Sequence, residues 1–124
     1  MIRTIAATAA AVLLLTAHPA AAAAPRRTDL TVSYLAEAGY AAAVKLRCDP
    51  AGGAHPRKVQ ACRALARAGG DPARLRPATV LCTMEYAPVT AQVKGVWQGR
   101  RVDWSHKFGN RCDMSRTTGV LTAF

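Results

Sequence analysis

Four cysteines in a short chain constrain this sequence more than any other feature. They are Cys48, Cys62, Cys82 and Cys112, in a chain of 124 residues. An even number of cysteines in a small exported protein is typical of a disulfide framework. Four cysteines allow three pairings, and the local one joins Cys48 to Cys62 and Cys82 to Cys112. On the chain-entropy account, each of these two loops contributes roughly 3–4 kcal/mol of stability.

The first residues of the chain predict export from the cell. Met1–Arg3 is a short basic start, Ile5–Ala17 is apolar, and Ala20–Ala24 offers several Ala-x-Ala cleavage sites. This is the layout of a secretory signal peptide. The alternative is an uncleaved membrane anchor, which is disfavoured because the apolar run is shorter than the roughly 20 residues that a spanning helix needs. We therefore predict a signal peptide at 1–23 and one secreted, extracellular domain at 24–124, with no membrane segment in the mature form.

The charge balance is strongly basic, with 17 Lys and Arg against 7 Asp and Glu and a net charge of +10. The cations are spread along the chain and lack an accompanying set of aromatic residues for base stacking, so nucleic acid is not the expected partner. A solvated surface that keeps an exported protein soluble accounts for most of them. The alternative that stays open is a cationic secreted protein that binds anionic polymers of a cell surface.

The sequence does not predict an enzyme. Asp103, Ser105 and His106 contain the residue types of a hydrolase triad, but neighbouring residues of a strand point to opposite faces, so Ser105 and His106 cannot meet. No paired cysteine or histidine spacing typical of a metal site occurs, and the glycine patterns that hold phosphate groups are absent. We therefore predict no catalytic residue, no cofactor and no metal.

Hydrophobic periodicity predicts a small α+β domain with an antiparallel sheet. Spacings of three and four residues indicate one helix at Arg57–Ala68, and strict alternation indicates strands. The alternating segments are Leu30–Tyr34, Tyr40–Cys48, Val89–Trp97 and Val102–Phe108. The last two form a hairpin through Gln98-Gly99. A short helical turn within Gly109–Thr118 and a terminal strand at Val120–Phe124 complete the prediction.

Several segments together resemble one known family. Cys48–Pro56, with the sequence Cys-Asp-Pro-Ala-Gly-Gly-Ala-His-Pro, resembles the signature of the Streptomyces subtilisin inhibitor family. Cys82–Val89, with the sequence Cys-Thr-Met-Glu-Tyr-Ala-Pro-Val, is similar to that family's reactive-site segment. Gly95–Gly99, Phe108–Cys112 and the ending Ala123-Phe124 add to a resemblance that covers Leu30–Phe124.

The resemblance implies both a fold and a function. Members of the family are secreted inhibitors of serine endopeptidases that bind the protease active site as a substrate does. The implied fold is a two-layer sandwich, in which a five-stranded antiparallel sheet carries two helices on one face. The implied partners are subtilisin-like proteases, with chymotrypsin-like enzymes as further targets, and a second copy of the chain in a homodimer formed through the sheet.

Carried over residue by residue, the resemblance also implies the site. The reactive bond would be Met84–Glu85, with Met84 entering the primary specificity pocket of the protease. Asn110 and Pro88 would support the loop, which Cys82 anchors through Cys112. The remaining protease-contacting residues would be Val80, Leu81, Cys82, Thr83, Tyr86 and Ala87.

The loop departs from the family pattern at three positions. Thr83 stands where the founding member has proline, so one fixed φ angle is lost. Glu85 replaces an apolar residue after the reactive bond, and Ala87 replaces a common aspartate. Arg63, in the predicted helix, stands where a small or acidic residue is usual.

Overall fold

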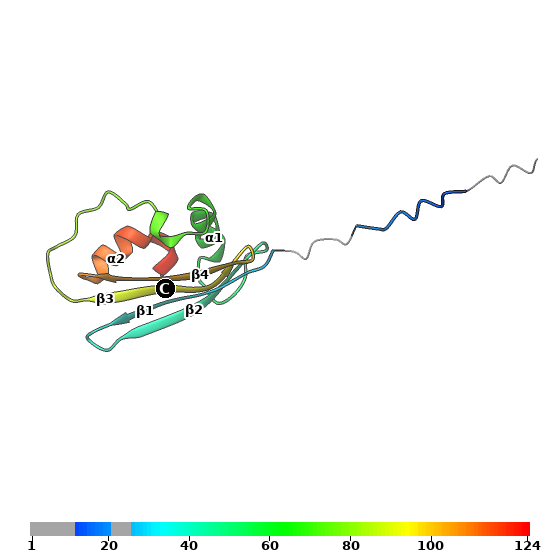
Figure 1. Ribbon diagram of the computed structural model, residues 1–124. Helices are drawn as coiled ribbons and strands as arrows, with labels where there is room; N and C mark the ends of the chain where they lie inside the picture. Colours follow the sequence, from blue (N-terminus) through cyan, green and yellow to red (C-terminus); the bar gives the residue numbers. More distant parts are fainter. Residues whose placement is uncertain (1–11, 21–25) are drawn as a thin grey trace, which may run out of the picture.

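The computed structural model describes residues 12–20 and 26–124, and its folded part is a single sheet with helices on one face (Figure 1). The sheet is antiparallel throughout, with the strand order β2-β1-β3-β4. Its strands are β1 (Thr28–Ala36), β2 (Ala41–Cys48), β3 (Val89–Trp97) and β4 (Arg100–Phe108). The helices are α1 (Lys58–Arg67) and α2 (Arg111–Thr118), with 3-10 turns η1 (Pro72–Arg74) and η2 (Gly119–Thr122).

The predicted signal peptide lies mostly outside the described residues, which omit 1–11 and 21–25. Residues 12–20 form neither helix nor strand, and their side chains are exposed. None of the helices in the described ranges is both long and apolar enough to span a bilayer.

The central strand β1 shows why alternation predicted the sheet correctly. Leu30, Val32 and Tyr34 are buried on its inner face, and Val32 lies opposite Val44 of β2 and Val93 of β3. The β3–β4 hairpin is confirmed, with Gln98 and Gly99 both at positive φ (46° and 81°). Two consecutive left-handed residues match the right-handed twist of a hairpin.

The helical layer packs on the same inner face and completes the core. Leu65 of α1, Met114 of α2 and Leu121 of η2 have no solvent exposure. The disulfide Cys48–Cys62 fastens the end of β2 to α1, with a Cα–Cα distance of 5.7 Å. Both predicted helical regions and this disulfide are therefore confirmed.

The expectation of five strands is wrong, because the sheet formed by the described residues has four. The predicted terminal strand at Val120–Phe124 is instead the 3-10 turn η2, in which Ala123 N–H donates to Val120 O at 3.2 Å. Its backbone has partners other than a strand: His55 Nε2 lies 3.0 Å from Leu121 O, and the Tyr34 hydroxyl donates to Phe124 O at 2.8 Å. The segment thus stays in the helical layer and inserts Leu121 into the core.

The outer face of the sheet carries polar side chains and a few apolar ones. Lys45 Nζ lies 2.5 Å from Asp29 Oδ1, and this hydrogen bond, with the positive charges of Lys45, Arg27 and Arg47, lowers the pKa of Asp29. Leu35 is 58% exposed on this face. No helix in the described part of the chain covers it, so one sheet face makes the core and the other meets the surroundings (Figure 1).

The turn after α1 provides a stability test. Gly70 has φ +79°, and a Cβ there would lie 2.1 Å from Cδ1 of the buried Trp97 ring. Gly69 has a similar φ of +65°, but a Cβ there would meet nothing within 4 Å. We expect Gly69→Ala to cost about 1–2 kcal/mol for the left-handed conformation alone. Gly70→Ala should cost about 1–3 kcal/mol more, because Trp97 must move.

Urea unfolding of the two variants and the wild type measures both costs. Equal losses in Gly69→Ala and Gly70→Ala would contradict the packing of Trp97 against this turn.

Candidate functional site

An irregular segment with exposed apolar side chains joins η1 to β3. The part that carries them runs through residues 78–88, which form neither helix nor strand. Leu81 is 100% exposed and Met84 98% exposed, and Tyr86 and Val80 are also largely exposed. Folded proteins rarely present several large apolar side chains together unless they bind something. This segment, here called the exposed loop, is therefore the candidate site.

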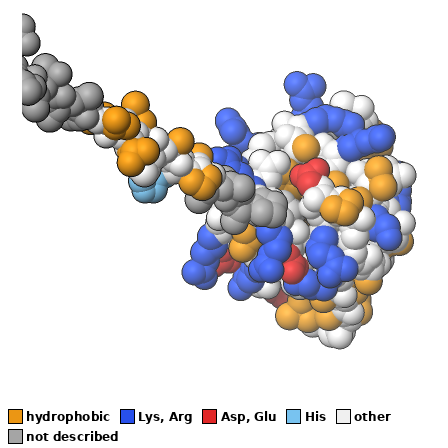
Figure 2. Space-filling model, turned by 90° about the vertical axis from the view of Figure 1, so that its right-hand side faces the viewer, with side chains coloured by type: hydrophobic (Ala, Val, Ile, Leu, Met, Phe, Trp, Pro, Cys, Tyr) orange, Lys and Arg blue, Asp and Glu red, His pale blue; other side chains and the backbone are white. Residues whose placement is uncertain are grey.

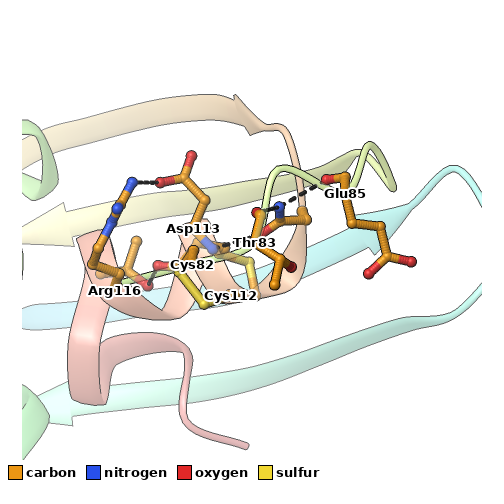
Figure 3. Close-up of polar contacts among 9 residues, drawn as sticks. Cys82, Thr83, Glu85, Cys112, Asp113 and Arg116 are labelled. Carbon is orange, nitrogen blue, oxygen red and sulfur yellow. Dashed lines mark hydrogen bonds and ion pairs between the residues drawn. A yellow bond between two sulfur atoms is a disulfide. The ribbon is translucent and has the colours of Figure 1, made fainter. Parts of the chain in front are cut away.

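The backbone of the exposed loop is held by a disulfide and by hydrogen bonds, although most of its side chains are exposed to solvent. The disulfide Cys82–Cys112 joins it to the first turn of α2, with a Cα–Cα distance of 5.7 Å (Figure 3). This is the predicted second pairing, so both predicted disulfides are confirmed. Before the disulfide, Ala78 N–H donates to Arg116 O at 2.8 Å, which ties the start of the loop to the end of α2.

The end of the loop is held by two further backbone hydrogen bonds. Ala87 N–H donates to Gly109 O at 2.8 Å, and Glu37 N–H donates to Pro88 O at 3.0 Å. Pro88 itself is buried. Glu37 also pairs with Lys107 of β4 at 2.6 Å, and this hydrogen bond raises the pKa of Lys107. The turn between β1 and β2 and the edge strand β4 thus both meet the loop where it enters β3.

Asn110 holds the middle of the loop with a single side chain. Its Nδ2 donates to Thr83 O at 3.0 Å and to Glu85 O at 2.8 Å, so the two bonds straddle Met84 (Figure 3). Its Oδ1 accepts from Asp113 N–H at 2.8 Å and so caps the N-terminus of α2. Asn110 is only 9% exposed. One planar amide therefore fixes the loop and the helix relative to each other.

Helix α2, which makes these contacts, is itself anchored in the core and by side-chain contacts. Met114 is fully buried in the core beneath it, and Asp113 pairs with Arg116 one turn later. The Thr118 hydroxyl donates to Met114 O at 2.7 Å and lies 2.6 Å from the Thr122 hydroxyl.

A hollow of about 300 Å³ remains between the loop and α2, lined in part by Asn110, Asp113 and Arg116. The side chains of Met84 and Glu85 are exposed on the loop above it.

The structure brings the predicted site residues together in this one loop. Val80, Leu81, Thr83, Tyr86 and Ala87 are exposed along it. Sequence reasoning did not find the backbone contacts from Arg116, Gly109 and Glu37. No residue type signals them, because the groups involved are main-chain atoms brought close only by folding.

The structure makes no hydrolase triad from the residues in β4. His106 is paired in register with Ala91 and Ser105 with Gln92, so their side chains lie on opposite faces of the sheet. The His106 ring packs against Phe108, with ring centroids 4.5 Å apart. In the described ranges, no group of three or more His, Cys, Asp or Glu side chains could hold a metal ion.

Comparison with known proteins places this architecture in a family. The model of the family described as "Subtilisin inhibitor-like" matches residues 24–110. The chain belongs to the subtilisin inhibitor-like family. The resemblance read from the sequence is thereby confirmed. The prediction that the chain is not an enzyme is confirmed too, because this is a family of protease inhibitors.

Individual relatives agree with this membership. The chain is 49% identical over 94 residues to "Subtilisin inhibitor-like protein 1" of Streptomyces cacaoi, covering 72% of this chain and 84% of the relative. It is 46% identical over 99 residues to a "Subtilase-type protease inhibitor" of Streptomyces coelicolor. That match covers 76% of this chain and 69% of the relative. Among solved structures, Streptomyces caespitosus sermetstatin, crystallised in complex with Bacillus licheniformis subtilisin, matches with a TM-score of 0.66 and 29% identity. That match covers 79% of this chain and 99% of the sermetstatin chain.

The double role of Asn110 can be tested by separating its two functions. Asn110→Asp keeps an oxygen for the helix cap but loses the NH₂ donor that binds Thr83 O and Glu85 O. We expect backbone order parameters around Met84 to fall from about 0.85 to below about 0.6, with α2 retained. Asn110→Ala should loosen the loop equally and in addition cost about 1 kcal/mol of stability, because the cap is lost.

The measurements are ¹⁵N relaxation for the loop and chemical unfolding for stability. Unchanged order parameters in both variants would show that the disulfide and the backbone hydrogen bonds fix the loop without Asn110.

Proposed function

We propose that this protein inhibits subtilisin-like serine endopeptidases by presenting the exposed loop to their active site as a substrate would. The reactive bond is Met84–Glu85. Met84 enters the primary specificity pocket, Val80, Leu81, Cys82 and Thr83 lie in the subsites before the bond, and Tyr86 and Ala87 follow Glu85 after it. Pro88 and Asn110 support this segment. Family membership and the match to an inhibitor seen with subtilisin support the proposal.

The observation that carries the proposal is the pair of hydrogen bonds from Asn110 to the carbonyls of Thr83 and Glu85. These carbonyls lie on opposite sides of the Met84–Glu85 bond. If a protease cuts that bond, both new ends remain attached to one amide, and the disulfide to Cys112 holds the first end as well. The ends stay close enough for the bond to re-form, so the loop acts as an inhibitor rather than as a substrate.

Rigidity also favours tight binding. A flexible peptide loses conformational entropy when a protease orders it, whereas a loop that is already ordered avoids most of that cost. Here the loop is tied to the rest of the domain at Ala78, Cys82, Ala87 and Pro88 as well as at Asn110. The binding energy of the exposed apolar side chains is therefore available for affinity.

Specificity tests the assignment of Met84. Subtilisin and chymotrypsin have apolar primary pockets, whereas trypsin has a carboxylate at the base of its pocket. Burying the thioether side chain contributes roughly 1.5–3 kcal/mol, so the wild type should inhibit subtilisin stoichiometrically, chymotrypsin weakly and trypsin hardly at all. Met84→Lys should improve trypsin inhibition by about 10–100-fold, because the new ammonium group pairs with the buried carboxylate.

Leu81→Lys is the matched control, since Leu81 is as exposed as Met84 and lies in the same loop. It adds the same charge outside the primary pocket and should leave the order of the three proteases unchanged. Inhibition titrations of the three enzymes with both variants test whether Met84 is the specificity residue. An unchanged profile for Met84→Lys would mean that the reactive bond lies elsewhere.

We further propose that the protein is exported, with the signal peptide cut after Ala22 or Ala23, and that residues 24–124 form the mature extracellular inhibitor. The tripartite pattern of the first 23 residues and the two disulfides support this proposal. Disulfides persist in oxidising surroundings outside the cytosol. N-terminal sequencing of the mature protein locates the cut.

The mature protein is also proposed to form a homodimer through the outer face of the sheet. A shallow hollow there is lined by residues of β1, β2 and β3, among them Leu35, Ala41 and Ala43. Leu35→Glu should weaken the dimer at least about tenfold, because it places a charge in an apolar contact. Val59→Glu is the control: Val59 is 46% exposed on α1, in the opposite layer. Sedimentation velocity at micromolar concentration would contradict the dimer if it found only monomers of the wild type.

A further inference from the structure

Three arginines line one pocket on the side of the helical layer that the exposed loop does not use. Arg67 is the last residue of α1, Arg74 lies in η1, and Arg76 precedes the loop. Together they line a pocket of about 510 Å³. The other lining residues are Ala64, Ala68, Leu75, Thr118, Gly119 and Val120. Among the residues placed by the structure, no acidic side chain lines this pocket, which is here called the arginine pocket.

These arginines have no protein partner in the part of the chain that the structure describes. The ion pairs there involve other cations, namely Lys45, Lys94, Lys107 and Arg116. Other guanidinium groups are held by hydrogen bonds, as Arg100 is by Gly69 O at 2.8 Å and Arg111 by the Tyr34 hydroxyl at 3.3 Å. Neither kind of contact engages Arg67, Arg74 or Arg76. Their donors are available for a ligand.

A structural role accounts for only one of the three. A cation in the last turn of a helix stabilises it through the helix dipole, and Arg67 occupies that position in α1. Arg74 and Arg76 lie outside both α-helices. All three side chains are exposed, so water and salt screen their mutual repulsion, and an anion in the pocket would attract all three.

We propose that the arginine pocket binds consecutive phosphate groups of a linear phosphate polymer. Guanidinium groups present planar pairs of donors that match phosphate oxygens, and they are less strongly hydrated than ammonium groups. The pocket volume exceeds what a single phosphate needs. Positive side chains outnumber negative ones on the face that Figure 2 shows, and the full chain has a net charge of +10, which adds long-range attraction for a polyanion.

The arginine pocket is separate from the exposed loop. The hollow under the loop is lined by Cys82 to Tyr86, Gly109, Asn110, Asp113 and Arg116, and the two sets of lining residues have no member in common. The protein can therefore hold a polymer and present Met84 at the same time. This binding does not depend on protease inhibition, so either activity can fail without the other.

The test compares two variants that lose the same charge. The pocket variant is Arg67→Gln/Arg74→Gln/Arg76→Gln. The control is Arg26→Gln/Arg57→Gln/Lys58→Gln, whose three side chains are exposed and line no part of the arginine pocket. Calorimetric titration with inorganic polyphosphate at fixed salt should show at least about a tenfold loss of affinity for the pocket variant relative to the control. Arg74→Lys, which keeps the charge but loses the planar donors, should also bind more weakly.

Three outcomes would overturn the proposal. They are no binding of polyphosphate by the wild type, equal losses in the two triple variants, and equal affinity for polyglutamate, which carries carboxylates instead of phosphates. Poly(glycerol phosphate) distinguishes the polymer type, because binding of both phosphate chains supports recognition of the phosphate group itself. The circular dichroism spectrum of each variant should match that of the wild type, which confirms that the variant is folded.

Discussion

The site depends on one side-chain amide that is shared between a helix and a loop. Asn110 caps α2 through its oxygen and holds the carbonyls on either side of Met84 through its nitrogen. Because the amide is planar and largely buried, the two contacts cannot change independently. The position of the exposed loop is therefore set by the position of α2, and that in turn by Met114 in the core.

The rest of the domain makes this arrangement stiff. The Cys48–Cys62 disulfide joins the helical layer to the sheet at one end, and Cys82–Cys112 joins the loop to α2 at the other. A domain of about 100 residues buries only a moderate core, so such crosslinks carry a large share of its stability. A rigid frame lets the loop keep large apolar side chains in water without collapsing onto the surface. This combination suits a protein that binds a protease active site.

The two layers place the three proposed binding surfaces on different residues. The sheet presents an open outer face with Leu35 and small side chains, whereas the helical layer carries the exposed loop and the arginine pocket. These surfaces use separate residues, so a second copy, a protease and an anionic polymer need not compete for the same atoms. Net positive charge attracts anions from a distance, and the arginine pocket gathers three guanidinium groups without a carboxylate among its lining residues.

The sequence by itself determined much of the local structure. Alternation in Leu30–Tyr34 and Val89–Trp97 identified strands, and Gln98-Gly99 identified the hairpin, because these patterns follow from the geometry of a single segment. Local spacing also gave the correct disulfides. The motifs Cys48–Pro56 and Cys82–Val89, together with Gly95–Gly99 and Phe108–Cys112, indicated the family.

Only the tertiary structure decided which distant residues contact each segment. The sequence suggested a strand at Val120–Phe124. A strand forms only beside another with free backbone groups, and here His55 and Tyr34 take up those of the terminal segment. The hydrogen bonds from Arg116, Gly109 and Glu37 to the loop are likewise main-chain contacts between distant residues. The grouping of Arg67, Arg74 and Arg76 around one pocket also appears only after folding, because long-range contacts depend on how the layers pack and not on the pattern of any one segment.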